Sequence, residues 1–306
     1  MPGSDCDVNP VLVNMGCGAT WHPDWINLDV RPVSPQVRRW NVQQGLPFED
    51  GQVDACYASH VLEHLTREQA DMLLRESLRV LRPGGIVRIA VPDLEAIARE
   101  YLNVLAQAEK GDPEAAGRYE WIMLELLDQL VRTESGGDME RYLRNGANHN
   151  AEYIVSRVGP ESEEVMTQGR NTFGRSTDGQ GPSLKRRLKQ ALASVVSPFV
   201  RESHCSVLEI DRMDLGFSRI VLGRRKRQAL REGLFRMSGE CHRWMYDRFS
   251  LGRVLHQSGF EKVEPCTAFE SRIAGFSSFN LDVSNGRIRK PDSLFMEAVK
   301  PGRSIA

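Results

Sequence analysis

The sequence lacks any apolar run that approaches the roughly 18 residues of a membrane-spanning helix, so we expect no transmembrane segment. Its first ten residues, MPGSDCDVNP, are polar and acidic. They do not show the basic end and apolar run of a secretory signal, which predicts a cytoplasmic protein. An excess of one charge is also missing, because the net charge over 306 residues is −1. Nothing in that total indicates a nucleic acid or an acidic partner.

Paired cysteine motifs are absent as well. None of the six cysteines shows C-x-x-C spacing, and a chain of this size does not need disulfides to hold a core. We therefore expect reduced thiols and no bound metal. The pairs His204-Cys205 and Cys241-His242 are weak zinc candidates, because adjacent residues rarely point at one ion. The cysteines are Cys6, Cys17, Cys56, Cys205, Cys241 and Cys266.

Short strands alternate with helical patterns through the first hundred residues. Hydrophobic residues make up 41% of the chain and charged residues 26%, as in globular proteins with a proper core. Runs of β-branched residues bounded by turn residues predict strands over 11–15, 25–30, 53–59 and 85–91. Several of these runs lack strict polar alternation, which favours a sheet that is covered on both faces. The expected fold class is α/β, a Rossmann-like seven-strand sheet.

One helix between these strands has clear start and stop signals. Thr66 and Gln69 predict a capping box, and Pro83-Gly84-Gly85 predicts the end. A strand, a helix and a strand in this order imply a right-handed parallel crossover. The apolar face of the helix comprises Ala70, Leu73, Leu74, Ser77, Leu78 and Leu81.

The middle of the chain is predicted to be a mainly helical insertion after the fifth strand. Asp112-Pro113 predicts a helix start, with an apolar face of Tyr119, Ile122, Met123, Leu126, Leu127, Leu130 and Val131. Residues 167–183 are rich in Gly, Ser, Thr and Asn and predict a loop, after which Ser183 caps a basic helix. The basic run continues at residues 224–227, RRKR.

The α/β pattern then returns, with a helix over 250–260 that Gly259 closes and strands over 262–269 and 293–299. The expected organisation is a first core segment over 1–100, the insertion over 101–241 and a closing core segment over 242–306. We expect the insertion to stand above the carboxyl ends of the strands as a lid that selects the acceptor.

The first strand ends in Asn14-Met15-Gly16-Cys17-Gly18, and the second ends at Asp29. Two glycines just past a strand allow a sharp turn against which a ligand can lie. A carboxylate at the tip of the next strand can accept both ribose hydroxyls of an adenosine. The third glycine of a nicotinamide-binding motif is missing, and 18–25 is too short for the helix that would meet a pyrophosphate. An adenosine ligand without phosphates suits this pattern.

These motifs resemble the class I S-adenosylmethionine (SAM)-dependent methyltransferases. The resemblance rests on NMGCG…NLDV, on LPFEDGQVDACYASHVLEHL at 46–65 and on LRVLRPGGIVRIAVPD, in that order. The L-P-F…D…E-H-L signature is similar to the type-11-like small-molecule subgroup. The tail, from HRWMYDRFSLGRVLHQSGF onward, resembles bacterial predicted methyltransferases associated with surface-polysaccharide synthesis. The resemblance implies SAM as cofactor and a small acceptor, with a sugar hydroxyl of a glycan precursor as the expectation.

The resemblance also implies which residues contact SAM. Gly16 and Gly18 lie under its methionine and ribose parts, and Asp29 holds the ribose diol. Asn14 and Asn41 stand where the family usually has acidic residues, which changes the contacts to the methionine amine and the adenine. The full implied set is Asn14, Met15, Gly16, Cys17, Gly18, Asp29, Val30, Asn41, Val42 and Ser59.

Methyl transfer to an alcohol needs a base, because the hydroxyl loses its proton. His60 and His64 flank the end of the strand over 53–59, and Asp93 follows the next strand. Histidine titrates near working pH, whereas Asp93 also suits a helix cap. Packing roles for both histidines stay open.

On the acceptor side we expect His242, Tyr246 and Arg272, with Asp247, Lys290 and Asp292 as further candidates. Cationic side chains suit phosphorylated or nucleotide-linked sugars.

Two other functions remain open from the residues. An RNA methyltransferase is disfavoured by the net charge and by ASHV in place of the N/D-P-P-Y/F signature after residue 57. A non-catalytic SAM-binding subunit would keep the glycine turn without the base. The basic helices also allow weak association with a membrane surface. No oligomeric state is indicated.

Overall fold

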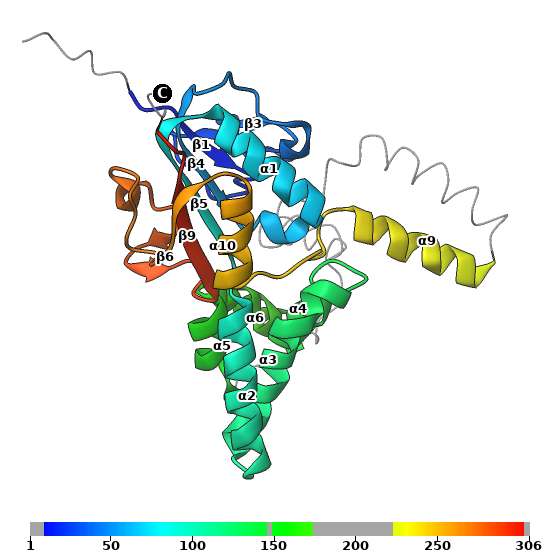
Figure 1. The fold of residues 1–306 in the computed structure, drawn as a ribbon. Helices are drawn as coiled ribbons and strands as arrows, with labels where there is room; N and C mark the ends of the chain where they lie inside the picture. The colour runs from blue at the N-terminus through cyan, green and yellow to red at the C-terminus, as the bar shows by residue number, and fades with distance from the viewer. Residues whose placement is uncertain (1–8, 146–148, 174–222, 303–306) are drawn as a thin grey trace, which may run out of the picture.

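The computed structural model describes residues 9–145, 149–173 and 223–302. It contains the expected seven-stranded sheet, in the order β3-β2-β1-β4-β5-β9-β6 (Figure 1). The first five strands of that order run parallel, and β9 is antiparallel to both of its neighbours. The strands are β1 (Leu12–Met15), β2 (Ile26–Asp29), β3 (Val37–Arg39), β4 (Val53–Ser59), β5 (Leu81–Pro92), β6 (Glu261–Cys266) and β9 (Ser293–Val299).

The β4–α1–β5 crossover follows the sequence signals closely. Helix α1 (Arg67–Val80) begins with the expected capping box, in which the Thr66 side chain accepts from Gln69 N and the Gln69 side chain accepts from Thr66 N. It ends before Pro83, as expected, but Leu81 already belongs to β5. Helix α10 (Arg248–Gln257) starts with a second capping box at Asp247 and Ser250, and it ends before Gly259.

The two faces of the sheet are covered differently. Helices α1 and α10 lie on one face (Figure 1), above a core that includes Val13, Met15 and Cys56. No helix separates β1 from β2. The opposite face instead packs against Trp25 and the 3-10 helix η5 (Phe276–Phe279). Because neighbouring residues of a strand point to opposite sides, each buried strand supplies both cores.

A buried ionic cluster joins β5 and β9 on the face that η5 covers. The Arg88 side chain is fully buried and donates to Asp282 Oδ2 and Glu297 Oε1, each at 2.8 Å. Its guanidinium carbon lies 4.6 Å from the centre of the Phe276 ring. Asp282 also accepts from the Tyr57 hydroxyl at 2.5 Å. The cluster fixes the C-terminal segment, whose hairpin is β7 (Val283–Ser284) and β8 (Arg287–Ile288), against the sheet.

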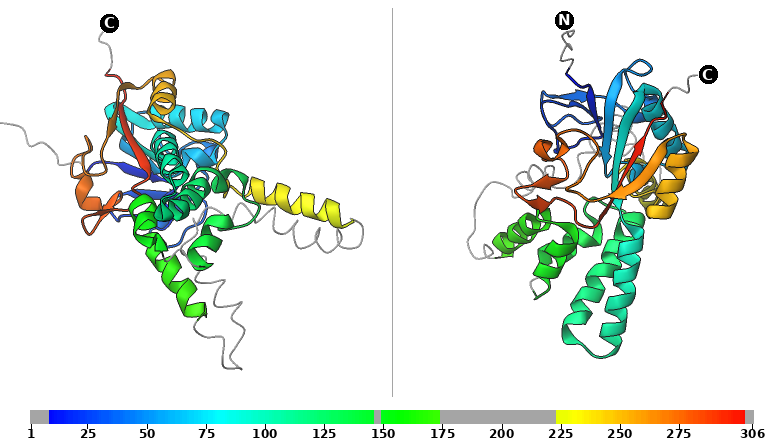
Figure 2. Two further views of the ribbon diagram at one scale, coloured as in Figure 1. Left: turned by 90° about the horizontal axis from the view of Figure 1, so that it is seen from below. Right: turned by 60° about the vertical axis from the view of Figure 1, so that its left-hand side comes forward.

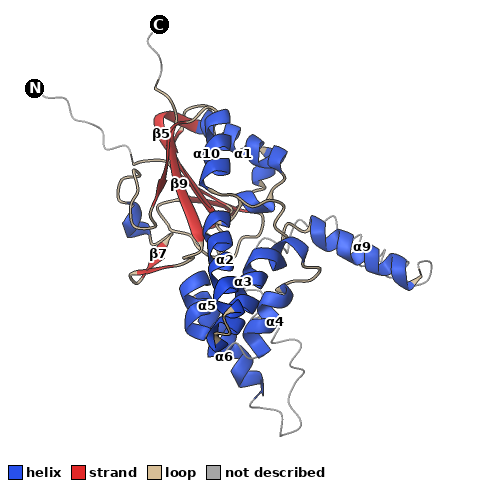
Figure 3. Cartoon of the chain, turned by 60° about the horizontal axis from the view of Figure 1, so that its bottom comes forward, coloured by secondary structure: helices blue, strands red, loops and turns tan. Residues whose placement is uncertain are grey.

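The helices over residues 94–145 and 149–173 gather at the end of the sheet where β5 ends (Figures 2 and 3). Helix α9 projects from the body of the molecule and carries the basic run at 224–227. None of the helices in the described ranges combines the length and apolar character needed to cross a bilayer. The helices that the structure describes in this part of the chain are α2 (Leu94–Glu109), α3 (Pro113–Val131), α4 (Gly137–Asn145), α5 (Ala151–Val158), α6 (Glu161–Phe173) and α9 (Arg224–Met237).

The insertion corrects two sequence-based expectations. Helix α3 starts at the Asp112 cap as expected, and its predicted apolar face is buried in part, with Ile122 in a core cluster and Tyr119 and Leu126 packed against it. Leu127 and Val131 are 41% and 57% exposed, whereas Glu125 and Asp128 are buried. Arg157 and Arg132 pair with these carboxylates, so the inward side of α3 holds two ion pairs beside its buried apolar residues.

Residues 167–173 were expected to form a loop but complete α6. Residues 174–183, the helix after Ser183 and His204-Cys205 lie outside the described residues. The four described cysteines, Cys17, Cys56, Cys241 and Cys266, are free thiols, as expected.

Candidate functional site

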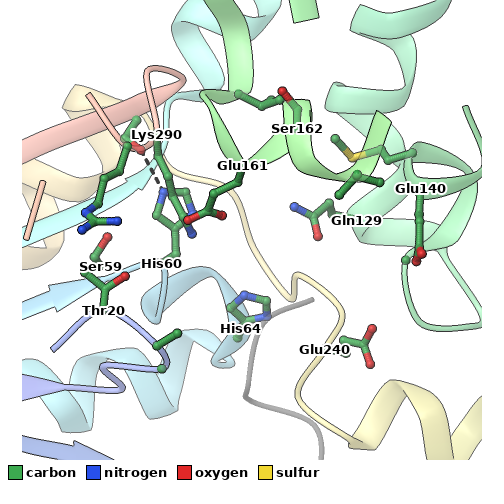
Figure 4. Close-up of a pocket in the computed structure, with 18 of the residues that line it drawn as sticks. Thr20, Ser59, His60, His64, Gln129, Glu140, Glu161, Ser162, Glu240 and Lys290 are labelled. Atoms are coloured by element: carbon green, nitrogen blue, oxygen red, sulfur yellow. Dashed lines mark hydrogen bonds between the residues drawn. The ribbon is translucent and has the colours of Figure 1, made fainter. Parts of the chain in front are cut away.

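A cavity of about 510 Å³ lies between the carboxyl ends of β1 and β4, the start of β9 and the inserted helices. This is the position where open α/β sheets bind ligands. Figure 4 shows Thr20 and Ser59 on the sheet side, with Gln129 and Glu140 opposite them. The sheet contributes Asn14, Gly16, Cys17, Gly18, Ser59 and His60 to the lining, and the insertion contributes Gln129, Met139, Glu140, Arg144, Glu161 and Gln168.

The floor of the cavity on the sheet side is the glycine turn after β1. Gly16 and Gly18 have φ values of 64° and 54°, in the left-handed region that favours glycine. Gly16 N and Cys17 N both donate to Leu28 O, at 2.8 and 3.1 Å. These hydrogen bonds hold the turn against β2. Because Gly16 and Gly18 have no side chains, a ligand in the cavity can approach their backbone directly.

Asp29 accepts a hydrogen bond from the backbone of this turn and lies outside the cavity lining. Its Oδ2 accepts from Gly18 N at 2.8 Å, and its Oδ1 accepts from Arg31 N at 2.7 Å. The residue is 1% exposed and does not line the cavity. Burial raises the pKa of the Asp29 carboxyl, and the two backbone donors act in the opposite direction. Each Asp29 oxygen thus accepts one backbone N–H, and the ribose contact that the sequence predicts for this residue stays a prediction.

The other expected cofactor residues divide into two groups. Asn14 lines the cavity and donates through Nδ2 to Thr20 O and to Asn27 Oδ1, which orders the loop after β1. Gly16, Cys17, Gly18 and Ser59 also line the cavity. The residues that do not line it are Met15 and Val42 in the core, Val30, Asp29, and Asn41, which caps the 3-10 helix η1 (Val42–Gln44).

His60 occupies a strained position at the end of β4. Its φ is 55°, which is uncommon outside glycine and often found at functional sites. Nδ1 lies 3.1 Å from Glu63 Oε1, and Nε2 lies 2.8 Å from Ser293 Oγ. Burial lowers the pKa of His60 well below its usual value, and the charge of Lys290 lowers it further, while Glu161 acts to raise it. The ring is therefore neutral at pH 7.

Two more histidines lie beside His60 and also line the cavity. The His64 and His242 rings meet edge to face, with centroids 4.8 Å apart. His64 belongs to the 3-10 helix η2 (Leu62–His64), and His242 comes from the segment between α9 and α10. Burial lowers the pKa of both rings, and Glu63 acts to raise that of His64.

Asp93, Tyr246 and Arg272 are not brought to this cavity. Asp93 caps α2, where its Oδ1 accepts from Glu95 N and Ala96 N. Tyr246 is buried in the core, and its carbonyl accepts from Leu94 N. The Arg272 side chain pairs with Glu264 at the edge of the sheet. The sequence could not distinguish these structural roles from contacts with a ligand.

Sequence reasoning missed several polar residues that the structure brings to the site. Glu63 is completely buried beside His60 and His64, and Glu240 is 2% exposed at the cavity wall. Glu63 stands in the E-H-L signature, which is a signal that can be read from the sequence. Glu240 and Gln129 belong to no recognisable sequence motif. Only the packing of the insertion brings them to the cavity wall.

Comparison with known proteins gives one family match. Residues 15–89 match the family model described as a methyltransferase domain. No protein of curated function matches the sequence. The matched segment holds the glycine turn, β2, β4, α1 and most of β5. The match covers about a quarter of the chain, and over these residues the chain is similar to a methyltransferase domain.

Three of the solved structures that match this chain are described as methyltransferases or as a complex with one, all with TM-scores of 0.35 or less. A "SAM-dependent methyltransferase, possible histamine N-methyltransferase" from Thermotoga maritima is 10% identical, covers 95% of this chain and 82% of its own, and has a TM-score of 0.34. PKMT2 from Rickettsia typhi, in complex with AdoHcy, is 11% identical over 97% of this chain and 50% of its own, with a TM-score of 0.35.

The third is a complex of the Haloferax volcanii Trm112 methyltransferase activator with a putative methyltransferase. It is 19% identical, with a TM-score of 0.24 and coverage of 29% of this chain. This chain spans about half (48%) of the length of that structure.

Proposed function

We propose that the protein is a SAM-dependent methyltransferase that methylates a hydroxyl group of a small polar acceptor. A single cavity carries the proposal, because it joins the glycine turn of the methyltransferase domain to the buried His60–Glu63 pair. Its volume of about 510 Å³ lies within the roughly 300–1,000 Å³ that is typical of small-ligand sites.

The sheet side of the cavity fits SAM. Gly16 and Gly18 leave room for a ligand against the backbone, and Ser59 and Asn14 offer polar atoms beside it. When bound, SAM supplies a methyl group on a positively charged sulfur, an excellent leaving group. The main task of the protein is then to align the acceptor, since positioning can contribute about 7–11 kcal/mol.

His60 is the proposed general base. If Nδ1 carries the proton and donates to Glu63, Nε2 is left as the acceptor, at present facing the Ser293 hydroxyl. The acceptor hydroxyl gives its proton to Nε2 as its oxygen forms the new bond to carbon. The Glu63 carboxylate then stabilises the imidazolium. Such base catalysis is worth about 100- to 10,000-fold.

The insertion side of the cavity favours a hydroxyl-rich acceptor. Gln129, Glu140, Arg144 and Gln168 present hydrogen-bonding groups of both kinds, as the rim of a sugar site requires. We therefore propose a sugar hydroxyl of a glycan precursor. This finer assignment rests on the resemblance of the tail and on the polarity of the lining.

The proposal is tested by calorimetric titration with SAM and S-adenosylhomocysteine, followed by an assay of S-adenosylhomocysteine release with monosaccharides, nucleotide-linked sugars and short RNAs. We expect micromolar binding of SAM and turnover with a sugar class. A folded protein that binds neither ligand would overturn the methyltransferase assignment. Turnover with RNA alone, with a strong salt dependence, would overturn the acceptor class.

His60→Gln separates binding from chemistry, with His256→Gln on the exposed side of α10 as a matched control. We expect His60→Gln to lower kcat by about 100-fold or more with SAM affinity unchanged. Equal rates for the two variants would exclude His60 as the base.

A further inference from the structure

Glu63, His64 and His242 form a cluster deeper in the wall of the cavity than His60. One ligand-capable atom of each of the three residues lies within 4.8 Å of the others, and all three residues are buried. His64 and His242 face the cavity, as Figure 4 shows for His64, whereas Glu63 lies behind the lining. The general-base proposal uses His60 and one oxygen of Glu63, and leaves His64 and His242 without a role.

The carboxylate of Glu63 is the unusual member of this cluster. It is 0% exposed, and neither oxygen accepts a hydrogen bond of good geometry in the described structure. Among the described residues, two atoms that can carry a positive charge lie within 4.0 Å of Oε1: His60 Nδ1 at 3.1 Å and His64 Nε2 at 4.0 Å. A buried carboxylate without adequate partners costs several kcal/mol, so proteins pair such groups or use them to bind metals.

The separations suit three ligands of one ion. Donor atoms about 2.1 Å from a tetrahedral ion are about 3.4 Å apart, so side-chain rotations that close the present gaps by at most about 1.4 Å are sufficient. Two imidazoles on such an ion have ring centroids about 5 Å apart. The observed separation of the His64 and His242 centroids is 4.8 Å.

We propose that Glu63, His64 and His242 bind a divalent transition-metal ion, with an open coordination position that faces the cavity. Two histidines and one carboxylate are a donor set suited to Zn²⁺ and to neighbouring metals such as Fe²⁺ and Co²⁺, rather than to Mg²⁺ or Ca²⁺. Glu63 can serve the ion through Oε2 while Oε1 keeps its contact with His60. His60 would then orient the metal-binding carboxylate of Glu63 through its contact with Oε1.

The charges around the cluster act in both directions. Lys290 lines the same cavity and disfavours a nearby cation. Arg132 adds a second positive charge at His242, although it is paired with Asp128. Glu161 and Glu240 line the cavity and carry the opposite charge. Within the cluster itself, the Glu63 carboxylate supplies the negative charge for the ion.

A role for this ion in the reaction rests on the proposed function, whereas binding of the ion does not. The open position would hold the oxygen of the acceptor hydroxyl and lower its pKa, as metals do for bound water. The hydroxyl proton then passes to His60 Nε2, and the oxygen attacks the methyl carbon as the carbon–sulfur bond breaks. Acceptor and SAM become methyl ether, S-adenosylhomocysteine and one proton.

The test starts with the full chain, stripped of metal by a chelator and titrated with Zn²⁺ in competition with a chromophoric chelator. We expect one tight equivalent for the wild type and for the His256→Gln control. Glu63→Gln and His242→Gln should each weaken binding by at least tenfold, and circular dichroism checks that both remain folded. Binding of no tight equivalent by the wild type, or equal affinity in all four proteins, would refute the site.

A second readout needs no variant. Co²⁺ bound by the wild-type protein should show the visible absorption of a four- or five-coordinate nitrogen and oxygen site, and one equivalent of Zn²⁺ should abolish it. A spectrum with a strong thiolate-to-cobalt band would assign the ion to a cysteine such as Cys241 and overturn the proposal.

SAM titration of the metal-free protein separates the two proposals. Binding of SAM without a tight metal equivalent defeats the metal site alone. A metal equivalent without SAM binding defeats the proposed function alone, because the three ligands lie outside the glycine turn.

Discussion

Replacement of Asp29 by asparagine tests how the glycine turn is built. Asp29 is 1% exposed, and each of its oxygens accepts one backbone N–H, from Gly18 at 2.8 Å and from Arg31 at 2.7 Å. Asparagine has one acceptor oxygen, so its NH₂ group must face one of these two donors. One charge-assisted hydrogen bond is lost, which is worth about 1.5–3 kcal/mol. The facing N–H groups add to that cost.

We expect Asp29→Asn to lower the free energy of unfolding by about 2–3 kcal/mol, measured by urea denaturation with SAM absent. The affinity for SAM should also fall by tenfold or more, measured by calorimetry under conditions where the variant is folded. The loss in affinity follows because Gly18 leaves its place under the ligand and because the ribose hydroxyls lose a charged acceptor.

Asp24→Asn is the matched control, since the Asp24 side chain is 70% exposed just before β2. It should change both quantities little. If Asp29→Asn keeps wild-type stability, the hydrogen-bond reasoning for the turn is wrong. If stability falls while SAM affinity stays within twofold, the turn is structural and does not cradle the cofactor.

Three further outcomes are expected. His60→Gln should lose about 100-fold or more in kcat, read from S-adenosylhomocysteine release at saturating SAM, and the lost rate should not return at higher acceptor concentration. Arg88→Met leaves Asp282 and Glu297 buried without their partner, so urea denaturation should show a loss of about 3–5 kcal/mol; a loss under 1 kcal/mol would contradict the cluster's role. Burial, with the Glu125 charge second, raises the pKa of Asp292 to about 7. The folded state then binds more protons than the unfolded state between about pH 4 and pH 7, so this group's contribution to stability falls as pH rises through that window. Asp292→Asn should therefore gain about 2 kcal/mol relative to the wild type between pH 4 and pH 8, about half of the full shift because the side chain is partly exposed. An unchanged difference between the two proteins would disprove this assignment.

The sequence could indicate those parts of the fold whose signals are local. The capping box at Thr66, the cap at Asp112 and the strand runs over 53–59 and 293–299 all formed where they were expected. Strand β3 was missed because Val37 is its one buried residue, which leaves no pattern to detect. The burial of Glu125 and Asp128 on α3 was missed because their partner arginines come from elsewhere in the chain or lie just beyond the helix.

The residues of the candidate site also fall into those that local sequence signals could predict and those that only the tertiary structure could place. The glycine turn and the position of His60 at the tip of β4 follow from strand ends, which the sequence determined by itself. Whether Asp93 caps a helix or meets a ligand, and whether His242 joins Glu63 and His64, depended on how the insertion folds back over the sheet. Contacts between residues so far apart in the chain are decided by burial and charge pairing across the whole structure, so only the tertiary structure could bring these groups to one cavity.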